Sequence, residues 1–180
     1  VNMNVIGGSS NQKPGTAATF SFSVKESGLY KLAFRVKQNY RDGLPTYRRI
    51  EVDGSVPFKE FSEYKFINKS NWRTEVLSSE KGEPYLLYLE SGTHTLTLTA
   101  LQGEYYDLNK ILRADAQRLS DLLLQIRKIT GNEPDYNYDY RLDTQIPDML
   151  GTFAELEDNM KLMMSMISKI SGQTTAKYNE

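Results

Sequence analysis

The sequence has 180 residues, 39% hydrophobic and 25% charged, a composition typical of a soluble globular protein. Lysine and arginine number 22 against 23 aspartates and glutamates, and a net charge of −1 argues against nucleic acid as a partner. No apolar run approaches the ~20 residues of a membrane span, and the absence of cysteine excludes disulfides, thiolate nucleophiles and cysteine-based metal sites.

Up to about Gln102 the hydrophobic residues recur with a period of two. Residues 19–24, 30–37 and 95–100 each alternate apolar and polar side chains, which indicates strands with one buried and one solvated face. Turn signals recur at residues 13–15, 27–28, 42–43, 53–54, 81–82 and 91–92. Their spacing predicts about seven or eight short strands, and therefore a β-sandwich over residues 1–104.

The stretch YRRIEVDGSVPFKEF, residues 47–61, is predicted to belong to this sandwich. Ile50 and Val52 share the inward face of a strand, and Asp53 begins a turn. Because strand side chains alternate, Arg48 and the arginine that follows it point to opposite faces. One of the two arginines is therefore available to a loop or a ligand.

From about Tyr106 the period becomes that of a helix. Apolar residues follow a four-three rhythm along residues 108–129, with Asp115 as the one break, and again along residues 149–170. Two such stripes joined by a short loop predict an antiparallel helical hairpin over residues 105–172.

The ends of these helices also carry signals. Gly131 stops the first helix and Gly172 the second. Pro147 suits a first helical turn, which places the start of the second helix near residues 144–147. The polar residues 173–180 predict a linker or a frayed end.

We expect the apolar stripe of the second helix to be buried, because each large side chain left in water forgoes ~1.5–3 kcal/mol. That stripe comprises Met149, Phe153, Leu156, Met160, Met163 and Ile167. The matching stripe of the first helix comprises Leu112, Leu119, Leu122 and Ile126. Further apolar residues lie beside the line along which the two helices touch. They predict docking on the sandwich or self-association through the helices.

Catalytic and metal-binding patterns are missing from the sequence. The single histidine, His94, is in phase with Leu96 and Leu98 at the start of a strand, where a structural role is expected. No nucleophile–base set, phosphate loop, zinc motif or calcium loop stands out. We therefore predict no enzymatic activity, no cofactor and no tightly bound metal.

Aromatic residues near arginines are the strongest ligand signal. Flat rings beside hydrogen-bonding forks suit sugar rings, which stack on aromatic faces. The candidate ligand-binding residues are Tyr40, Arg41, Tyr47, Arg48, Tyr64 and Trp72. The alternative is that these rings cover the sandwich core. A second aromatic run, DYNYDY at residues 135–140, is expected to pack against the protein, with a partner contact as the alternative.

Two segments resemble a known module type. SFSVKESGLYKLAFRVKQ (residues 21–38) and SGTHTLTLTA (residues 91–100) resemble the galactose-binding-like sandwich of carbohydrate-binding modules. Members that bind a structural calcium carry acidic residues in the first strand, whereas residues 1–24 contain none. The resemblance thus implies a jelly-roll sandwich in which the usual calcium is not expected.

A narrower resemblance spans nearly the whole chain. YRRIEVDGSVPFKEF, NWRTEVL, GEPYLLYLESGTHTL and ITGNEPDYNYDYRLDTQIPDM resemble a segment of large extracellular solute-binding lipoproteins of Firmicutes ABC transporters. In that family such a sandwich, followed by a helical hairpin, accompanies the substrate-binding domain, and the ligands are usually taken to be sugars. The resemblance implies an extracellular location, anchored to the cell surface through a parent polypeptide.

Three functions follow as hypotheses. The first is a non-catalytic accessory domain of a sugar-uptake binding protein, which contacts carbohydrate or acts as an interdomain scaffold. The second is a carbohydrate-binding module of a secreted glycoside hydrolase. The third is an assembly module whose working surface is the helical hairpin. Flanking sequence would separate the first two, and a glycan-array screen would separate both from the third.

Overall fold

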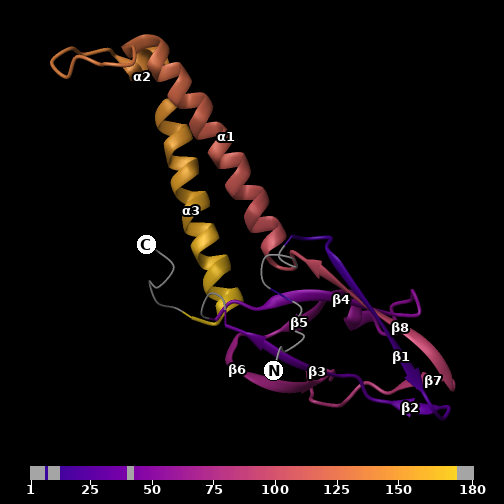
Figure 1. Ribbon diagram of the computed structural model, residues 1–180. Helices are drawn as coiled ribbons and strands as arrows, with labels where there is room; N and C mark the ends of the chain where they lie inside the picture. The colour runs from indigo at the N-terminus through magenta and orange to yellow at the C-terminus, as the bar shows by residue number, and fades with distance from the viewer. Residues whose placement is uncertain (1–6, 8–12, 40–42, 174–180) are drawn as a thin grey trace. The chain divides into compact units, whose positions relative to one another are not determined.

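The computed structural model describes residues 7, 13–39 and 43–173, and divides into two compact units between Gly103 and Glu104 (Figure 1). The described residues of the first unit form β1 (Ala17–Val24), β2 (Gly28–Tyr30), β3 (Ala33–Gln38), β4 (Thr46–Val52), β5 (Tyr64–Phe66), β6 (Lys69–Val76), β7 (Leu87–Leu89) and β8 (Gly92–Leu101). A short 3-10 helix, Lys59–Glu63, precedes β5. The second unit contains α1 (Tyr105–Thr130), α2 (Leu142–Gln145) and α3 (Met149–Ser171).

The strands form two layers. One layer is an antiparallel sheet with the order β1-β8-β4-β5. The other comprises the pairs β2-β7 and β3-β6, joined where Leu77 donates its backbone N–H to the carbonyl of Leu32 at 2.9 Å. The predicted fold class, a β-sandwich followed by an α-helical hairpin, is confirmed.

Alternating side chains from both layers meet in the sandwich core. The buried cluster comprises Ile50, Phe61, Phe66 and Leu77, and the partly buried Phe34 and Val36 of β3 pack against it. A second cluster, Val24, Val52 and Leu89, fills the end of the sandwich near β2 and β7. As expected, Ile50 and Val52 of β4 point inward.

A glycine at the end of the sandwich makes room for a tyrosine. Gly103 has a φ of +55°, and a Cβ there would lie 2.2 Å from the ring of Tyr47. Only a residue without a side chain fits against the ring in this left-handed backbone. The buried position of Tyr47 therefore depends on Gly103.

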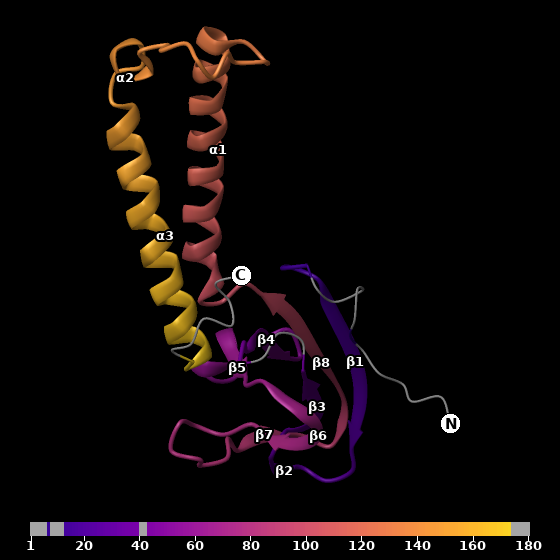
Figure 2. The ribbon, with the colours of Figure 1, turned by 90° about the vertical axis from the view of Figure 1, so that its left-hand side faces the viewer.

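The second unit is a hairpin of two long helices. α1 and α3 run antiparallel and side by side, and Figures 1 and 2 show them joined through the segment that contains α2. On α3 the buried residues are Leu156, Met163 and Ile170, spaced seven apart as expected of a helix pair. The α1 residues buried with them include Asp115 and Leu122.

The start of the second helix differs from its prediction. α3 begins at Met149, two residues beyond Pro147, and the short helix α2 precedes it. Ile146 is extended, with φ −116° and ψ 93°, because the ring of a following proline disfavours helical backbone. Pro147 therefore separates two helices and does not open one.

The prediction of a fully buried α3 stripe was also wrong in part. Leu156 and Met163 are buried, but Phe153 is 42% exposed and Met160 is exposed as well. Two helices touch along one line only, so side chains beside that line remain in contact with solvent.

Candidate functional site

The predicted ligand-binding residues fall into three groups. Tyr40 and Arg41 lie outside the described residues. Arg48 on β4 pairs in register with Tyr64 on β5, so these two are neighbours in one sheet, with Tyr47 beside them. Trp72 belongs to β6, in the opposite layer. The structure therefore does not gather the described candidates into one site.

The β4–β5 candidates are engaged with the protein. Tyr47 is buried, with the Lys65 ammonium 5.8 Å from its ring centre. Burial lowers the pKa of Arg48, whose guanidinium donates to the Tyr47 carbonyl at 2.8 Å. Tyr64 packs edge-on against Phe61 and Phe66, and burial is the main cause that raises its pKa. These three residues support the sandwich core.

Trp72, by contrast, presents its ring to solvent. Leu77 is buried in the core, and Arg73 and Glu75 before it are partly buried, so these alternate positions face inward and Trp72 faces outward with Thr74 and Val76. The indole side chain is 38% exposed. β6 pairs with β3, and the register of that pair shifts between Val36 and Gln38, beside the part of β6 that contains Trp72.

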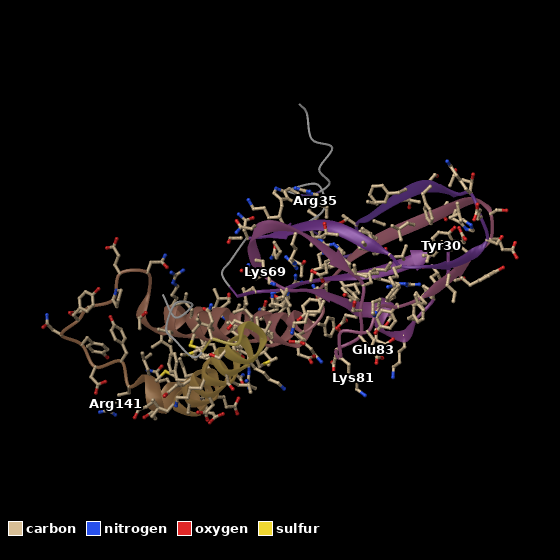
Figure 3. The ribbon with its side chains drawn as sticks, turned by 90° about the horizontal axis from the view of Figure 1, so that it is seen from below. Tyr30, Arg35, Lys69, Lys81, Glu83 and Arg141 are labelled. Carbon is tan, nitrogen blue, oxygen red and sulfur yellow. The ribbon has the colours of Figure 1, made fainter. Side chains whose placement is uncertain are left out.

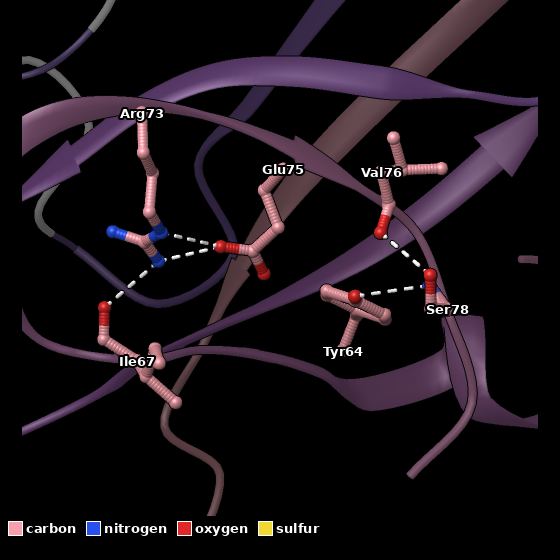
Figure 4. A network of polar contacts seen from close by, with 6 residues as sticks. All are labelled: Tyr64, Ile67, Arg73, Glu75, Val76 and Ser78. Atoms are coloured by element: carbon pink, nitrogen blue, oxygen red, sulfur yellow. Dashed lines mark hydrogen bonds and ion pairs between the residues drawn. The ribbon is translucent and has the colours of Figure 1, made fainter. Parts of the chain in front are cut away.

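An ion pair between Arg73 and Glu75 lies on the partly buried face of β6 (Figure 4). Arg73 Nε donates to Glu75 Oε2 at 2.8 Å, and Arg73 Nη2 donates to the Ile67 carbonyl at 3.0 Å. Both charged side chains are more than four-fifths buried. Residues two apart on a strand share a face, and this spacing of opposite charges is the signal by which the pair could have been found in the sequence.

Figure 4 also shows how β6 continues into the core. The Ser78 N–H donates to the Tyr64 hydroxyl at 3.4 Å, and Ser78 Oγ donates to the Val76 carbonyl at 2.9 Å. The first of these bonds ties the segment after β6 to β5 in the other layer, and the second is local to that segment. The contacts on the inner face of β6 therefore fix the orientation of the strand that displays Trp72.

His94 has a structural position at the edge of the sandwich. Its Nδ1 lies 2.7 Å from Asp53 Oδ2, and its Nε2 lies 2.8 Å from the Glu90 carbonyl oxygen. Because both partners are acceptors, only the imidazolium form donates to both of them. The Thr95 N–H donates to the other oxygen of Asp53 at 2.8 Å, so the turn after β4 is joined to β8.

This arrangement makes stability depend on pH. The hydrogen bond with Asp53 is the main cause that raises the pKa of His94 above 6.5, and the same bond lowers the pKa of Asp53 below 3.8. A raised histidine pKa contributes stability below pH 6.5 that is lost as the pH rises through the folded-state pKa. A lowered aspartate pKa contributes stability above pH 3.8 that is lost as the pH falls through the folded-state pKa.

We therefore expect the contribution of the His94–Asp53 pair to the melting temperature of the sandwich to be largest between about pH 4 and pH 6.5. Thermal melts of the wild type and of His94→Gln from pH 3 to pH 9 would test this. The difference between the two proteins should be largest within that window and shrink above it. A difference that stays constant from pH 5 to pH 9 would contradict a stabilising imidazolium.

Among the described residues of the helical unit, the carboxyl group of Asp115 is buried. Asp115, the break in the predicted stripe, lies on the contact line between the helices, where Asn159 Nδ2 donates to its Oδ1 at 2.8 Å. The sequence pattern marked this position as an exception but gave no partner for it. A polar pair at a helix seam fixes the register of the two helices.

α1 displays a second apolar stripe beside this seam. With 100° between successive residues, Leu112, Leu119 and Leu123 lie ~50–90° to one side of the line through Asp115 and Leu122. All three leucines are exposed.

The same displacement occurs on α3. Phe153, Met160 and Met164 lie ~50–90° to the same rotational side of the line through Leu156 and Met163, and all three are exposed. Because the helices are antiparallel, equal rotation about each axis brings both stripes to one side of the hairpin. We name this surface the open apolar face: Leu112, Leu119, Leu123, Phe153, Met160 and Met164.

The DYNYDY run does not pack as the sequence suggested. Tyr136 is 96% exposed and Tyr138 is exposed as well, while Tyr138 and Tyr140 form an edge-on ring pair at 4.8 Å. The Asp135 N–H donates to the Tyr140 hydroxyl at 2.8 Å, so the loop is ordered by its own contacts. Figure 3 labels Arg141 at this end of the hairpin.

No group of three or more histidine, aspartate or glutamate side chains among the described residues is arranged to hold a metal ion. In the same part of the chain no helix is both long and apolar enough to cross a membrane. Within the helical unit, a shallow cavity of about 170 Å³ is lined by Arg118, Asp121, Leu122, Gln125, Ile146, Pro147 and Thr152.

Comparison with protein families gives one match. Residues 107–180 match the family model of the bacterial solute-binding protein, 4-helix bundle domain. The expected relationship to bacterial solute-binding proteins is thereby confirmed for the helical segment. Comparison with curated proteins gives no match.

Three solved structures are similar to part of the chain. A Paenibacillus sp. cycloisomaltooligosaccharide glucanotransferase complexed with cycloisomaltoheptaose is 34% identical over 51% of this chain and 12% of its own, with a TM-score of 0.40. A family 35 carbohydrate binding module from an environmental isolate is 19% identical over 51% of this chain and 58% of its own, with a TM-score of 0.36. A ruminal GH26 endo-β-1,4-mannanase is 18% identical over 48% of this chain and 15% of its own, with a TM-score of 0.32. The chain thus spans less than two thirds of each of these proteins.

Proposed function

We propose that the chain is a non-catalytic accessory segment of an extracellular solute-binding lipoprotein of an ABC transporter. Its helical unit packs with further helices of the parent protein to complete a four-helix bundle. Its sandwich contacts carbohydrate, which brings sugar close to the transport machinery or orients the substrate-binding domain.

One observation carries this proposal. The segment that matches a four-helix bundle domain contributes two long helices in the described residues, and those helices leave the open apolar face uncovered. Six large apolar side chains on one side of a helix pair are an unusual surface for a protein to leave in water. A second helix pair packed on this face would produce the bundle for which the family is named.

Cysteine labelling tests the packing directly, because the chain has no cysteine of its own. Leu119→Cys places a thiol on the open apolar face, and Leu124→Cys places one on the opposite side of α1; the two leucines are 46% and 55% exposed. We expect a maleimide to label both variants of the dilute 180-residue chain. In the full-length parent protein, Leu119→Cys should be protected at least ~10-fold and Leu124→Cys should remain reactive.

Equal labelling of both positions in the parent protein would contradict the four-helix packing. Protection of both positions would mean that the hairpin is enclosed on all sides, which is also inconsistent with a bundle formed on one face. Melting temperatures of the two variants serve as the folding control.

The carbohydrate contact is supported by Trp72. The indole faces solvent on a strand whose other face carries the Arg73–Glu75 ion pair, and such an aromatic surface can stack on a sugar ring. A glycan-array screen of the wild type and of Trp72→Ala would test it. We expect the alanine variant to lose the signal. If the wild type binds no glycan on the array, the carbohydrate contact is refuted and only the assembly role remains.

A further inference from the structure

We propose that the outer face of the layer formed by β2, β3, β6 and β7 binds a polysaccharide that carries negative charges. This inference rests on the proposed carbohydrate contact and adds the class of ligand to it. Trp72 supplies the stacking platform, and cations on the neighbouring strand β3 bind the acidic groups of the sugar.

The cations lie on one line. On β2, β3 and the residues between them, the outward positions alternate with the inward Leu32, Phe34 and Val36, which pack on the core. The outward positions are Leu29, Lys31, Ala33, Arg35 and Lys37, and all five are exposed. At ~3.3 Å per residue, the three cations extend over about 20 Å.

No carboxylate balances these charges. Beyond the register shift, the outward positions of β6 are Trp72, Thr74 and Val76, and that of β7 is Tyr88, so none of these positions carries an aspartate or glutamate. Across the sheet, Arg35 pairs with Thr74, and Lys31, Arg35 and Lys37 form no ion pair in the described part of the chain. A charge-balanced chain, with 22 basic and 23 acidic residues, thus places three cations along this line and no acidic side chain at the outward positions of the strands beside it.

Exposed apolar groups accompany the charges. Leu29 pairs in register with Tyr88, and both side chains are more than half exposed. Trp72 is exposed on β6, the strand that pairs with β3 and its cations. Sugar rings with carboxylates or sulfates present this combination: apolar C–H faces to stack and fixed anions to pair. Figure 3 labels Arg35 and Lys69, another exposed cation, on the sandwich.

Lysines on an exposed strand also prevent edge-to-edge pairing of sheets, and this is the competing explanation. It predicts that charge matters for solubility alone and that Trp72 has no part in it. The ligand proposal predicts that the cations and Trp72 act together.

Affinity electrophoresis of the full 180-residue chain distinguishes these explanations. The gels would contain polygalacturonate, dextran sulfate or neutral dextran, and vesicles with anionic phospholipid form a fourth arm. The variants are Arg35→Glu, Lys37→Glu and Trp72→Ala. The matched control is Lys81→Glu, which makes the same charge change at an exposed loop position away from this face.

We expect retardation by polygalacturonate or dextran sulfate, and the stronger of the two identifies the carboxylate or the sulfate as the preferred group. Arg35→Glu, Lys37→Glu and Trp72→Ala should each weaken binding ~10-fold, and Lys81→Glu less than ~2-fold. Retardation should decrease as salt increases, because exposed charges are screened. Unchanged melting temperatures would show that the variants are folded.

Three results would overturn the proposal. Binding of neutral dextran that depends on Trp72 but not on Arg35 would retain the carbohydrate contact and refute its anionic class. Equal binding to both polyanions and to vesicles, unaffected by Trp72→Ala, would indicate nonspecific charge attraction. Absence of binding in every arm would refute both the anionic class and the carbohydrate contact, but not the bundle packing tested by cysteine labelling.

Discussion

Phe61→Ala should lower the free energy of unfolding of the sandwich by about 3–5 kcal/mol. Phe61 is 1% exposed and lies in the core cluster with Ile50 and Leu77. Its ring contacts those of Phe58 and Tyr85 at centroid distances of 5.1 Å each. The rings of Phe58 and Tyr85 also contact each other, with centroids 4.8 Å apart, so the substitution removes one of three mutually packed rings and leaves a cavity in the core.

Urea unfolding followed by tryptophan fluorescence would measure this loss. Trp72 is the single tryptophan and lies in β6, so its emission reports the sandwich and not the helices. Phe20→Ala is the matched control, because Phe20 is already partly exposed on β1 and its removal should cost about 1 kcal/mol. Equal losses for the two variants would show that the ring cluster around Phe61 is not the core of the unit.

Leu156→Asp should unfold the helical unit of the isolated chain. Leu156 is buried at the seam between α1 and α3, and a carboxylate there would be desolvated close to the buried Asp115. The combined loss of apolar burial and cost of an unpaired charge is at least about 3 kcal/mol, a large part of the stability of a two-helix unit. The helical circular dichroism signal at 222 nm should be weaker than that of the wild type at 25 °C, or it should be lost at a much lower temperature than in the wild type.

Phe153→Asp provides the comparison on the same helix. Phe153 lies three residues earlier, on the open apolar face. Its replacement should therefore lower the free energy of unfolding of the isolated chain by about 1 kcal/mol or less. In the parent protein the same variant should weaken packing of the bundle. Similar unfolding of the isolated chain by both variants would mean that the open apolar face is covered there, in disagreement with the structure.

The sequence predicts the fold class, strands followed by helices, well, for a physical reason. Alternation with a period of two and a four-three rhythm both report which side chains face a neighbour, and burial enforces both patterns. The turn at Asp53 and the inward positions of Ile50 and Val52 follow from the same constraint. The change of period near Tyr106 marks the change from strands to helices.

The candidate site was less accessible to prediction. Tyr47 and Trp72 are both aromatic residues close to arginines, yet one is buried against Gly103 and the other faces solvent. The difference depends on a glycine 56 positions later in the chain (103 minus 47), which no local pattern connects to Tyr47. The line of exposed cations on the outer face could not be recognised from the sequence, because the local pattern does not show which strands are neighbours.

The hairpin shows the same limit. Heptad spacing predicts which residues can lie at a seam, but not how many partners surround the helix. Leu119 and Leu122 follow the same rhythm, and one is exposed while the other is buried. The partner of Asp115 is Asn159, 44 residues away, and only the antiparallel register brings the two together.

The position of β8 in the sheet has a consequence for synthesis on the ribosome. β8 is the last strand of the sandwich and lies between β1 and β4, so Ala17 is paired with Thr99. Until β8 has left the exit tunnel, β1 has no partner among the described strands, and its sequence AATFSFSV contains no charge to discourage pairing with another chain. Nascent chains that stop before Gly92 therefore expose an uncharged, unpaired strand, and the N-terminal unit can complete its sheet only as the helical segment begins to be translated.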